Sequence, residues 1–410
     1  MNKKKLRERR YQNRQYDRNI DRQNNYMMFT NEYLMKNFLT YDDFLFAAKE
    51  ASHGVKWKNQ TMNYLLNIHI NTLKLMDEIF NDNFELQNVY EFDINERGKE
   101  RHITSYSFRD KVVFKTFNRI LKSGVNKYTI VSNCASIPGR GYHYAIKMLK
   151  EDLSYHYRHN GKEGYIIRGD FKSYFDSIPH DKLLEQIDDL YGNKDLTEFI
   201  SKIIKNDEGK GLSLGCELNQ ILAVQYPRKL DSFVTCQCHI KGYGRYMDDF
   251  YAICETREEA EKVLELIDIK TEEIGLKLNW KKTKIIKLTS TFKYLKNTFV
   301  ITDTGKILVK IEKKSVKRMV RKLKKFIDHY KNGQMSLEDI FTSYISWRGF
   351  SSQKDCYKLI CDVDKKFKKY FEDVIIKDID EFIKYYEGDD EIDEEIIKFN
   401  KRLKNNHIIK

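Results

Sequence analysis

Three aspartates stand in surroundings that suit metal chemistry. Asp170 ends the apolar run of residues 165–167, which is typical of a buried strand. Asp248 and Asp249 are adjacent among aromatic, strand-forming residues, a pattern that predicts the turn of a hairpin. Aspartate is also common in turns for ordinary hydrogen bonding, so the pair alone is a weak signal. Adjacent carboxylates on a partly buried surface, however, cost free energy unless a cation compensates them.

Carboxylates of this kind are ligands that Mg²⁺ prefers, together with water and substrate phosphates. Two such ions about 3.5–4 Å apart can activate an attacking oxygen and stabilise a leaving oxygen. The three aspartates are therefore compatible with a metal-dependent nucleotidyltransferase.

The overall charge points to a polyanionic partner. The 410 residues include 74 Lys and Arg against 61 Asp and Glu, which gives a formal net charge of +13. Hydrophobic residues make up 41% and aromatic residues 13%, and this content excludes a disordered chain. The basic excess favours nucleic acid or an anionic membrane surface as partner, and composition does not choose between them.

Several classes of protein are excluded by the sequence. No apolar run approaches the roughly 18 residues of a membrane-spanning helix, and the N-terminal residues lack the apolar core of a secretory signal. Seven thinly spread cysteines favour reduced thiols, so we expect a cytoplasmic protein. Cys236 and Cys238 lack the spacing of a zinc site, and we interpret them as strand packing.

The elements that must position the aspartates are mixed. Alternating residues on both sides of a turn at residues 96–99 predict a hairpin, and apolar runs predict further strands around the aspartates and at residues 285–311. Helical spacing predicts one long helix over residues 219–234 and another over residues 257–274. This order of elements indicates an α+β fold with a mainly antiparallel sheet.

Charge is unevenly distributed along the chain. Residues 1–25 carry nine Lys and Arg, and residues 372–395 are strongly acidic. A predicted helix after Lys313 has an apolar stripe surrounded by charges of one sign, which favours contact with phosphates over a merely solvated face. The residues expected to make this contact are Arg318, Arg321, Lys322 and Lys325.

Together these residues resemble the reverse transcriptase family. The sequence Tyr246-Met247-Asp248-Asp249 resembles the Tyr-x-Asp-Asp box of that family, and residues 170–178 resemble its first palm motif, D-x-x-x-[FY]-F-D-x-I. Residues 211–220 resemble the next box, residues 275–283 the G-L-x-L-N-x-x-K-T motif and residues 292–295 the primer-grip strand. Residues 101–113 and 136–145 resemble the two fingers motifs of the family, and residues 344–349 resemble a thumb motif of its bacterial members. The motifs run in family order over roughly residues 85–350.

The resemblance implies a right-hand polymerase fold and RNA-directed synthesis of DNA from dNTPs. It divides the chain into a basic N-terminal extension (residues 1–60), fingers (61–160), palm (161–300), helical thumb (301–375) and C-terminal tail (376–410). The implied partners are an RNA template, expected to be a structured noncoding RNA, and a DNA or RNA primer. An accessory protein or a second copy of the chain is a further expected partner. The motifs thus favour nucleic acid over membrane.

The resemblance also assigns roles to individual residues. Asp170 and Asp248 would hold two Mg²⁺, for which Mn²⁺ could substitute, with help from the backbone carbonyl of Phe171, and Asp249 would be the weaker partner. Contacts with the incoming dNTP fall to the hairpin, the first palm motif, the box of residues 211–220 and the G-L-x-L-N-x-x-K-T motif. The residues implied at this substrate site are Lys99, Arg101, Phe175, Leu214, Gln220 and Lys282.

Two of these positions imply selectivity. The ring of Phe175 would exclude ribonucleotides by contact with the sugar 2′ position. Leu214 stands where many reverse transcriptases have a glutamine that packs near the incoming base. An apolar residue there resembles the enzymes of diversity-generating retroelements and several unclassified bacterial groups, and we expect it to relax base selection.

The biological role is left open by these residues. The pattern is most similar to bacterial or phage-borne reverse transcriptases, and we expect a role in antiphage defence because a stand-alone polymerase with basic arms and no recognised mobility domain fits that role. A mutagenic retroelement enzyme is the alternative, as is template-independent or protein-primed synthesis, for which Tyr11, Tyr16 and Tyr26 could prime. A non-catalytic RNA-binding scaffold is disfavoured because all three aspartates are present.

Overall fold

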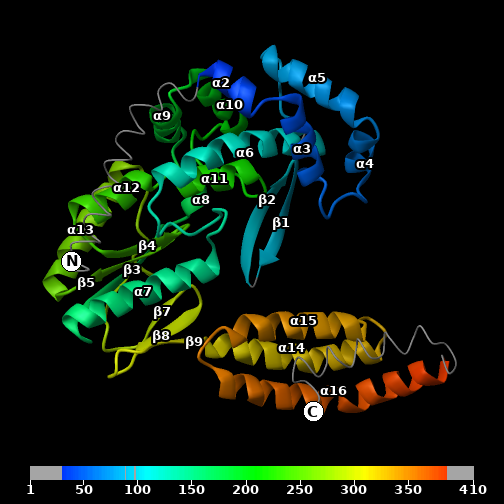
Figure 1. Cartoon of the computed structure of the whole chain (residues 1–410), viewed down its shortest axis with the longest axis vertical. Helices are drawn as coiled ribbons and strands as arrows, with labels where there is room; N and C mark the ends of the chain where they lie inside the picture. Colours follow the sequence, from blue (N-terminus) through cyan, green and yellow to red (C-terminus); the bar gives the residue numbers. More distant parts are fainter. Residues whose placement is uncertain (1–29, 88, 97, 386–410) are drawn as a thin grey trace, which may run out of the picture. The chain divides into compact units, whose positions relative to one another are not determined.

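A four-stranded antiparallel sheet carries the aspartates at one of its ends. Its strands lie in the order β4 (Gly242–Tyr246), β5 (Asp249–Cys254), β3 (Tyr165–Asp170) and β6 (Lys284–Lys287) (Figure 1). Side chains of β3 and β5 are buried along most of their length, as the apolar runs predict. Helix α7 (Tyr142–Asn160) packs against β4, and α13 (Arg257–Glu273) packs against β3 and β5.

The computed structural model describes residues 30–87, 89–96 and 98–385. The chain divides into two units, residues 1–287 and 288–410, and the sheet belongs to the first. The basic segment of residues 1–25, the tyrosines proposed as primers and the part of the acidic tail beyond residue 385 lie outside the described residues. No helix among the described residues is long and apolar enough to cross a membrane.

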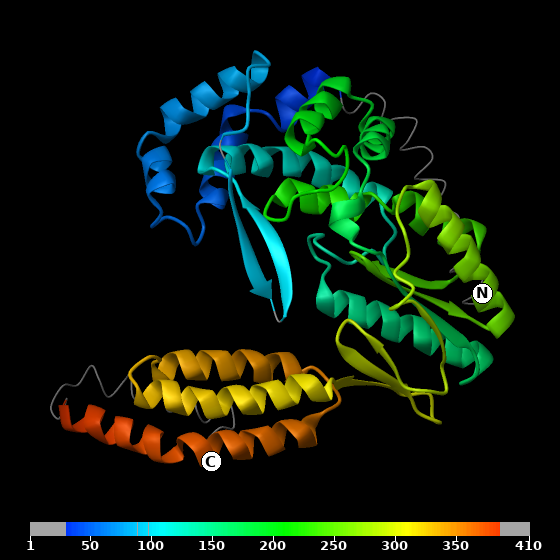
Figure 2. The ribbon, with the colours of Figure 1, turned by 180° about the vertical axis from the view of Figure 1, so that it is seen from behind.

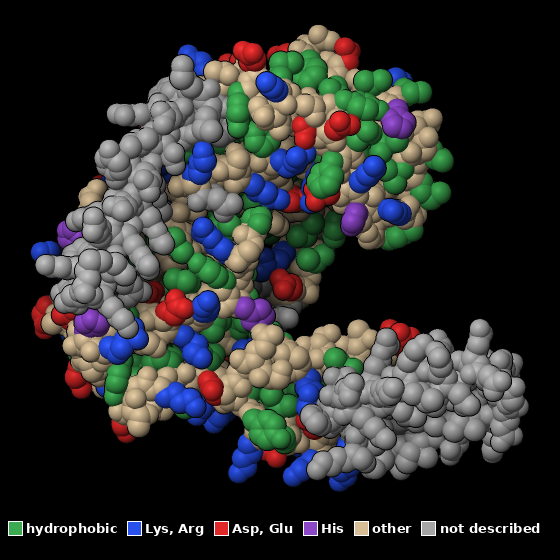
Figure 3. Space-filling model, in the orientation of Figure 1, with side chains coloured by type: hydrophobic (Ala, Val, Ile, Leu, Met, Phe, Trp, Pro, Cys, Tyr) green, Lys and Arg blue, Asp and Glu red, His purple; other side chains and the backbone are tan. Residues whose placement is uncertain are grey.

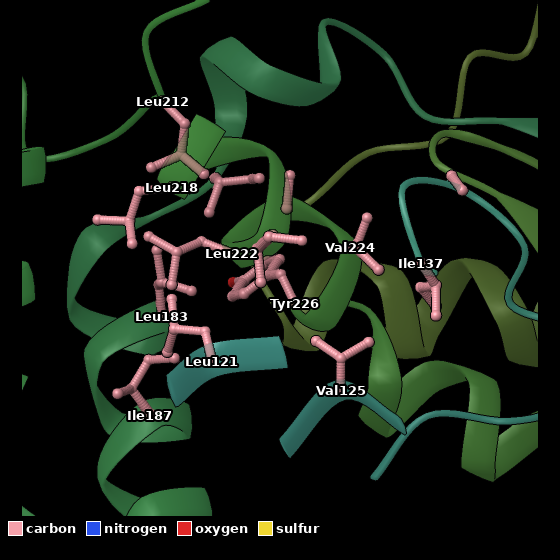
Figure 4. Packing of buried hydrophobic residues seen from close by; sticks show 14 of the residues in the cluster. Leu121, Val125, Ile137, Leu183, Ile187, Leu212, Leu218, Leu222, Val224 and Tyr226 are labelled. Carbon is pink, nitrogen blue, oxygen red and sulfur yellow. The ribbon is translucent and has the colours of Figure 1, made fainter. Parts of the chain in front are cut away.

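The helices of the first unit build one apolar core beside the sheet. Helix α6 (Phe108–Tyr128) packs on α3 (Tyr41–Ala51) and α11 (Glu217–Gln225), and both Leu121 and Val125 are buried in the same cluster as Leu222 of α11 (Figure 4). The Leu121 carbonyl accepts hydrogen bonds from the Tyr191 hydroxyl at 2.9 Å and the Gln225 amide at 3.0 Å. The other helices are α2 (Asn31–Asn37), α3 (Tyr41–Ala51), α4 (Asn59–Leu66), α5 (Ile68–Phe80), α8 (Tyr174–Ser177), α9 (His180–Tyr191), α10 (Lys194–Ile204), α11 (Glu217–Gln225) and α12 (Arg228–Ser232).

A two-stranded hairpin, β1 (Tyr90–Glu96) and β2 (Lys99–Ser105), extends from this core (Figure 2). Its strands pair along their full length, as the sequence predicts, and β1 is exposed throughout. Its base is tied to the loop of residues 211–215, because the Thr104 N–H donates to the Leu214 carbonyl at 2.8 Å. Gly215 has a φ of +113°, and a Cβ there would lie 2.3 Å from the Thr104 carbonyl oxygen, so this close approach requires glycine.

Helices α4 and α5 leave apolar side chains at the surface. Figure 3 shows hydrophobic side chains exposed over these two helices. Leu66 at the end of α4 is 77% exposed, and Trp57, in the turn before α4, is 74% exposed. The other exposed apolar side chains of α4 and α5 are Met62, Ile70, Leu73 and Phe80.

The second unit joins a small sheet to three helices. The antiparallel strands are β7 (Phe292–Tyr294), β8 (Asn297–Ile301) and β9 (Ile307–Ile311). The helices are α14 (Lys313–Lys331), α15 (Leu337–Ser352) and α16 (Tyr357–Tyr385). Leu323, Tyr344 and Phe367 are fully buried between these helices, so the apolar stripe predicted for α14 is its packing face.

Helices combined with antiparallel sheets confirm the predicted α+β class. Two expectations are wrong. The single helix expected over residues 219–234 is α11, α12 and a π-helical turn (Phe233–Gln237), because Pro227 lacks the N–H that would continue α11. Cys236 and Cys238 therefore lie in and after that π-helical turn, not in a strand. All seven cysteines are free thiols, as expected.

Candidate active site

Asp170 is held at the end of β3 by the loop that follows α13. Its carboxylate accepts a hydrogen bond from the Asn279 side-chain amide at 2.9 Å and from the Lys282 ammonium at 2.7 and 2.6 Å. The Asn279 backbone N–H also donates to the Asp170 carbonyl at 2.8 Å. Asp170 is 4% exposed, so its negative charge is largely removed from water and is matched by Lys282.

Asp248 lies in the two-residue turn between β4 and β5. Tyr246 pairs with Asp249 across the hairpin, which leaves Met247 and Asp248 as the turn, with Met247 in the left-handed region at φ +59°. A positive φ in the first turn position matches the right-handed twist of the flanking strands. The sequence prediction of a hairpin turn at the acids is confirmed, although Asp249 is already the first residue of β5.

The three aspartates meet because β3 and β5 are neighbours. Asp170 and Asp249 are paired across the two strands, and the Phe171 N–H donates to the Asp248 carbonyl at 3.3 Å. Residues 78 and 79 positions apart in the sequence are thus brought to one end of the sheet. Phe171 itself is buried, with its ring 5.6 Å from that of Phe250.

Burial and neighbouring negative charges raise the pKa of Asp249. Its pKa is raised from 3.8 to about 6, mainly by burial and then by the negative charges of Asp248 and Asp170, against an opposing effect of Lys282. Carboxylates that destabilise one another in this way are a fitting donor set for a hard divalent cation. In the described residues, no three His, Cys, Asp or Glu side chains are arranged so that they could hold a metal ion as they stand. The positive charge beside Asp170 comes from the Lys282 ammonium.

Removing the Asp249 carboxylate should stabilise the metal-free protein at neutral pH. Because the folded-state pKa is raised, the folded protein keeps a proton that the unfolded chain releases between about pH 4 and 6. The free energy of unfolding should therefore fall as the pH rises through this window, by roughly 2 kcal/mol after discounting for partial exposure. Asp249→Asn cannot titrate and should lack this loss.

Urea unfolding of both proteins in EDTA from pH 4 to 8 measures this effect. We expect the wild type to become less stable than Asp249→Asn as the pH rises, with the difference constant above about pH 7. A difference that is the same at pH 4 and pH 8 would refute the assignment of a raised pKa.

The substrate residues implied by the resemblance lie on connected segments of the first unit. Phe175 is half-buried in α8, and its carbonyl accepts a hydrogen bond from the Leu212 N–H at 2.8 Å. Leu214 is half-buried in the loop that holds the hairpin, while Gln220 is exposed on α11. Arg101 is exposed on β2 and pairs with Glu96 at 2.9 Å. Lys99 begins β2.

Lys282 has a partner in the structure that the sequence does not identify. The resemblance implies a contact with the triphosphate, which stays a prediction, and the structure shows the Lys282 ammonium donating to the Asp170 carboxylate. Asn279 was given no role from the sequence, yet it holds the same carboxylate. Its place three residues before Lys282 in the G-L-x-L-N-x-x-K-T motif is the signal that could have identified it.

The basic residues predicted to contact nucleic acid share one flank of α14, in the second unit. Arg318, Arg321, Lys322 and Lys325 are all exposed and recur at intervals of three and four residues. The Lys322 ammonium donates to the Ser343 hydroxyl at 2.9 Å and lies 5.1 Å from the centre of the Phe326 ring. The flank is thus fixed to the helical core of this unit.

Comparison with known families decides the assignment. Residues 94–299, which are half of the chain, match the family described as reverse transcriptase (RNA-dependent DNA polymerase). The chain belongs to the reverse transcriptase family. The match includes β2, the loop of residues 211–215 and all three aspartates, so the predicted right-hand polymerase fold is confirmed.

Two solved telomerase structures are among those that match this chain. The structure of apo telomerase from Candida tropicalis, truncated from its C-terminal domain, is 16% identical with a TM-score of 0.44, over 54% of this reverse transcriptase and 55% of that chain. Telomerase from Candida albicans in complex with a TWJ fragment of telomeric RNA is 14% identical with a TM-score of 0.45. That match covers 70% of this reverse transcriptase and 59% of the telomerase chain. This reverse transcriptase therefore spans less than two thirds of either telomerase chain. No curated protein matches the sequence.

Proposed function

We propose that this reverse transcriptase is an RNA-directed DNA polymerase that adds dNTPs to a primer 3′-OH. The observation that carries the proposal is the convergence of Asp170, Asp248 and Asp249 at one end of β3 and β5, within the residues that match the family. A template RNA and a primer are the proposed macromolecular partners. The product would be DNA complementary to the template.

The aspartates are proposed to hold two Mg²⁺ ions, or Mn²⁺ in their place. When bound, such ions stabilise charge on the attacking and leaving oxygens of an in-line phosphoryl transfer. Asp170 and Asp248 would contribute carboxylate oxygens and Phe171 its backbone carbonyl, with Asp249 beside them. Lys282 would have to release the Asp170 carboxylate, so that its ammonium becomes free to donate to the triphosphate.

Contacts to the incoming nucleotide are proposed for the hairpin and the loop tied to it. Arg101 would exchange Glu96 for the triphosphate, whose oxygens accept charge-assisted hydrogen bonds from a guanidinium as a carboxylate does. Lys99 would act as a second cation on the same strand. Because the Thr104–Leu214 hydrogen bond joins hairpin and loop, phosphate contacts by the hairpin and base contacts by Leu214 of the loop would be made together. Gln220 would contact the nucleotide from α11, which follows the loop.

Primer extension by the purified full chain tests the proposed activity. The assay combines dNTPs and Mg²⁺ with an RNA template and an annealed DNA or RNA primer, beside reactions that lack the template or the metal. We expect extension only with both, and sequencing of the product distinguishes copying from untemplated addition. A protein that incorporates no nucleotide with any template or primer would overturn the proposal.

Phe175→Ala should relax discrimination against ribonucleotides. The ring at this position is proposed to occupy the space that a ribose 2′-hydroxyl would need, and its removal opens that space. A pocket discriminates about 10- to 200-fold between two substrates that differ by one small group, as dNTP and rNTP differ by the 2′-hydroxyl. We expect the ratio of kcat/KM for dNTP over rNTP to fall within that range. An unchanged ratio in an active variant would show that Phe175 is only core packing.

Leu214→Gln should reduce misincorporation. An apolar side chain offers no hydrogen bond near the nascent base pair, so the wild type is proposed to select bases less strictly. Product sequencing on one defined template gives the error rate of both proteins, with Leu212→Ile in the same loop as a control. Equal error rates for wild type and Leu214→Gln would remove the proposed role of this position.

Antiphage defence in a bacterial or phage setting is the proposed biological role. The support is the similarity of the motifs to bacterial and phage-borne members of the family. Leu214 favours a mutagenic retroelement enzyme as the second candidate. Inspection of the neighbouring genes and noncoding RNA, followed by phage plating with and without the gene, separates the two. Loss of protection with Asp248→Asn supports defence, whereas template repeats and an accessory gene nearby favour the retroelement.

A further inference from the structure

A buried ion pair lies directly behind the turn that carries Asp248. Arg245 on β4 and Asp231 on α12 are both 0% exposed. The Arg245 Nε and Nη2 atoms donate to the Asp231 carboxylate at 2.7–3.1 Å, and the Tyr243 hydroxyl donates to the same carboxylate at 2.8 Å. Burial of this kind is unfavourable unless every donor and acceptor is satisfied, and here the carboxylate receives several hydrogen bonds.

The same guanidinium reaches the turn itself. Its Nη1 atom donates to the Met247 carbonyl at 3.0 Å, and its Nη2 atom donates to the Val224 carbonyl of α11 at 2.9 Å. Met247 is the left-handed residue of the turn and immediately precedes Asp248. One planar side chain therefore links Asp231, α11 and the peptide unit that joins Met247 to Asp248.

The backbone of Arg245 is fixed from a further direction. Its N–H donates to the Ser132 carbonyl at 3.0 Å, and its carbonyl accepts from the Cys134 N–H at 3.0 Å. The segment of residues 130–133 is held in turn by the Arg140 guanidinium, which donates to the Ile130 and Asn133 carbonyls. Both the backbone and the side chain of Arg245 are therefore held in place, so the guanidinium that donates to the Met247 carbonyl has a fixed position.

We propose that Arg245, oriented by Asp231, is a positioning residue that fixes the turn of Met247 and Asp248 and thereby aims the Asp248 carboxylate for divalent metal. The inference rests on the proposed polymerase function of the aspartates. Groups that hold a metal ligand in place typically change metal affinity or activity by roughly 10- to 100-fold when they are removed. Both residues are 0% exposed, so the effect would pass through the turn that Arg245 holds.

A pair that only stabilises the fold would behave differently. Replacing both charges with apolar residues of similar volume can leave a protein as stable as before, because the unfavourable burial disappears together with the attraction. Such a replacement still removes the hydrogen bond to the Met247 carbonyl. The double variant Arg245→Met with Asp231→Leu therefore separates the two roles.

Metal binding by the full chain, measured without catalysis, is the deciding experiment. Mn²⁺ is titrated against wild type and the double variant, and free Mn²⁺ is followed by electron paramagnetic resonance. We expect the apparent Kd of the double variant to rise by roughly 10- to 100-fold. The Mg²⁺ concentration for half-maximal primer extension should rise by a similar factor. Unchanged Mn²⁺ affinity in a folded double variant overturns the inference.

Tyr243→Phe is the matched control, because it removes one hydrogen bond from the same Asp231 carboxylate and none from the turn. It should lower the melting temperature and leave the Mn²⁺ affinity within about twofold of wild type. If the double variant does not fold, Arg245→Lys decides, because it keeps the charge beside Asp231 and loses the planar fork that reaches Met247. Wild-type affinity in that variant overturns the inference.

The binding readout also separates this inference from the proposed function. A wild type that binds Mn²⁺ through Asp248 but extends no primer contradicts the polymerase proposal, and the shift in the double variant still tests the role of Arg245. A wild type that extends primers while the variant binds and uses metal normally contradicts the role of Arg245 alone.

Discussion

Asp248→Asn should lower the rate of primer extension by at least about 10³-fold. The substitution keeps the size and the turn geometry of the side chain but removes a negative charge from the proposed metal site. Metal ions in such sites contribute several kcal/mol of charge stabilisation to the transition state, and about 4 kcal/mol corresponds to roughly 10³-fold in rate. Single-turnover extension with saturating primer, template and dNTP measures the loss.

Two controls make this result specific. Asp268→Asn applies the same chemical change on α13 and should leave the rate within about twofold of wild type. Thermal unfolding in EDTA should show Asp248→Asn to be at least as stable as wild type, because it relieves repulsion with Asp249. Extension by Asp248→Asn within about tenfold of wild type would contradict the assignment of Asp248 as a metal ligand.

Replacing the basic flank of α14 should weaken binding of a primer–template duplex by roughly 10³-fold near 0.15 M salt. Each phosphate contact that is lost reduces the slope of log K against log salt by about 0.9. Four lost contacts would reduce the magnitude of the slope by up to about 3.6, which gives this change in affinity. The variant replaces all four residues with Gln, namely Arg318, Arg321, Lys322 and Lys325.

The helix offers a control with the same change in charge. Lys313, Lys317, Lys324 and Lys331 are also exposed on α14 but lie on its other flank. Replacing these four with Gln changes the net charge equally and should affect affinity and salt dependence much less. Fluorescence anisotropy across a salt series measures both variants. Equal losses for the two would indicate that α14 contributes general attraction and no specific contacts.

Most elements could be predicted because their signals are local. The hairpin of β1 and β2 follows from alternating residues around Gly98, and α13 ends before Gly275, whose φ of +76° suits a helix terminus. The prediction of one helix over residues 219–234 is wrong because it rests on the helical spacing of apolar residues and neglects Pro227, which interrupts the helix. The π-helical turn that follows depends on tertiary packing, for which the sequence carries no comparable signal.

In the candidate site, too, local motifs could be predicted from the sequence and contacts between distant segments could not. Asp170, Asp248 and Asp249 were recognisable because each lies in a motif a few residues long, and the match over residues 94–299 agrees with those motifs. The partners of these residues were not recognisable. The sequence does not identify Lys282 and Asn279 as partners of Asp170, nor the pair of Arg245 and Asp231, although Arg245 directly precedes the Tyr-x-Asp-Asp box.

The sequence by itself determined the types and order of the reactive residues, the strands and helices that carry them, and the family to which the chain belongs. These properties depend on neighbours along the chain, whose effects on conformation are short-range. Only the tertiary structure decided that Asp170 faces Asp249, that Lys282 neutralises Asp170 and that Asp231 anchors Arg245. Strand register and buried ion pairs join distant segments, and they are selected by the packing of the whole core.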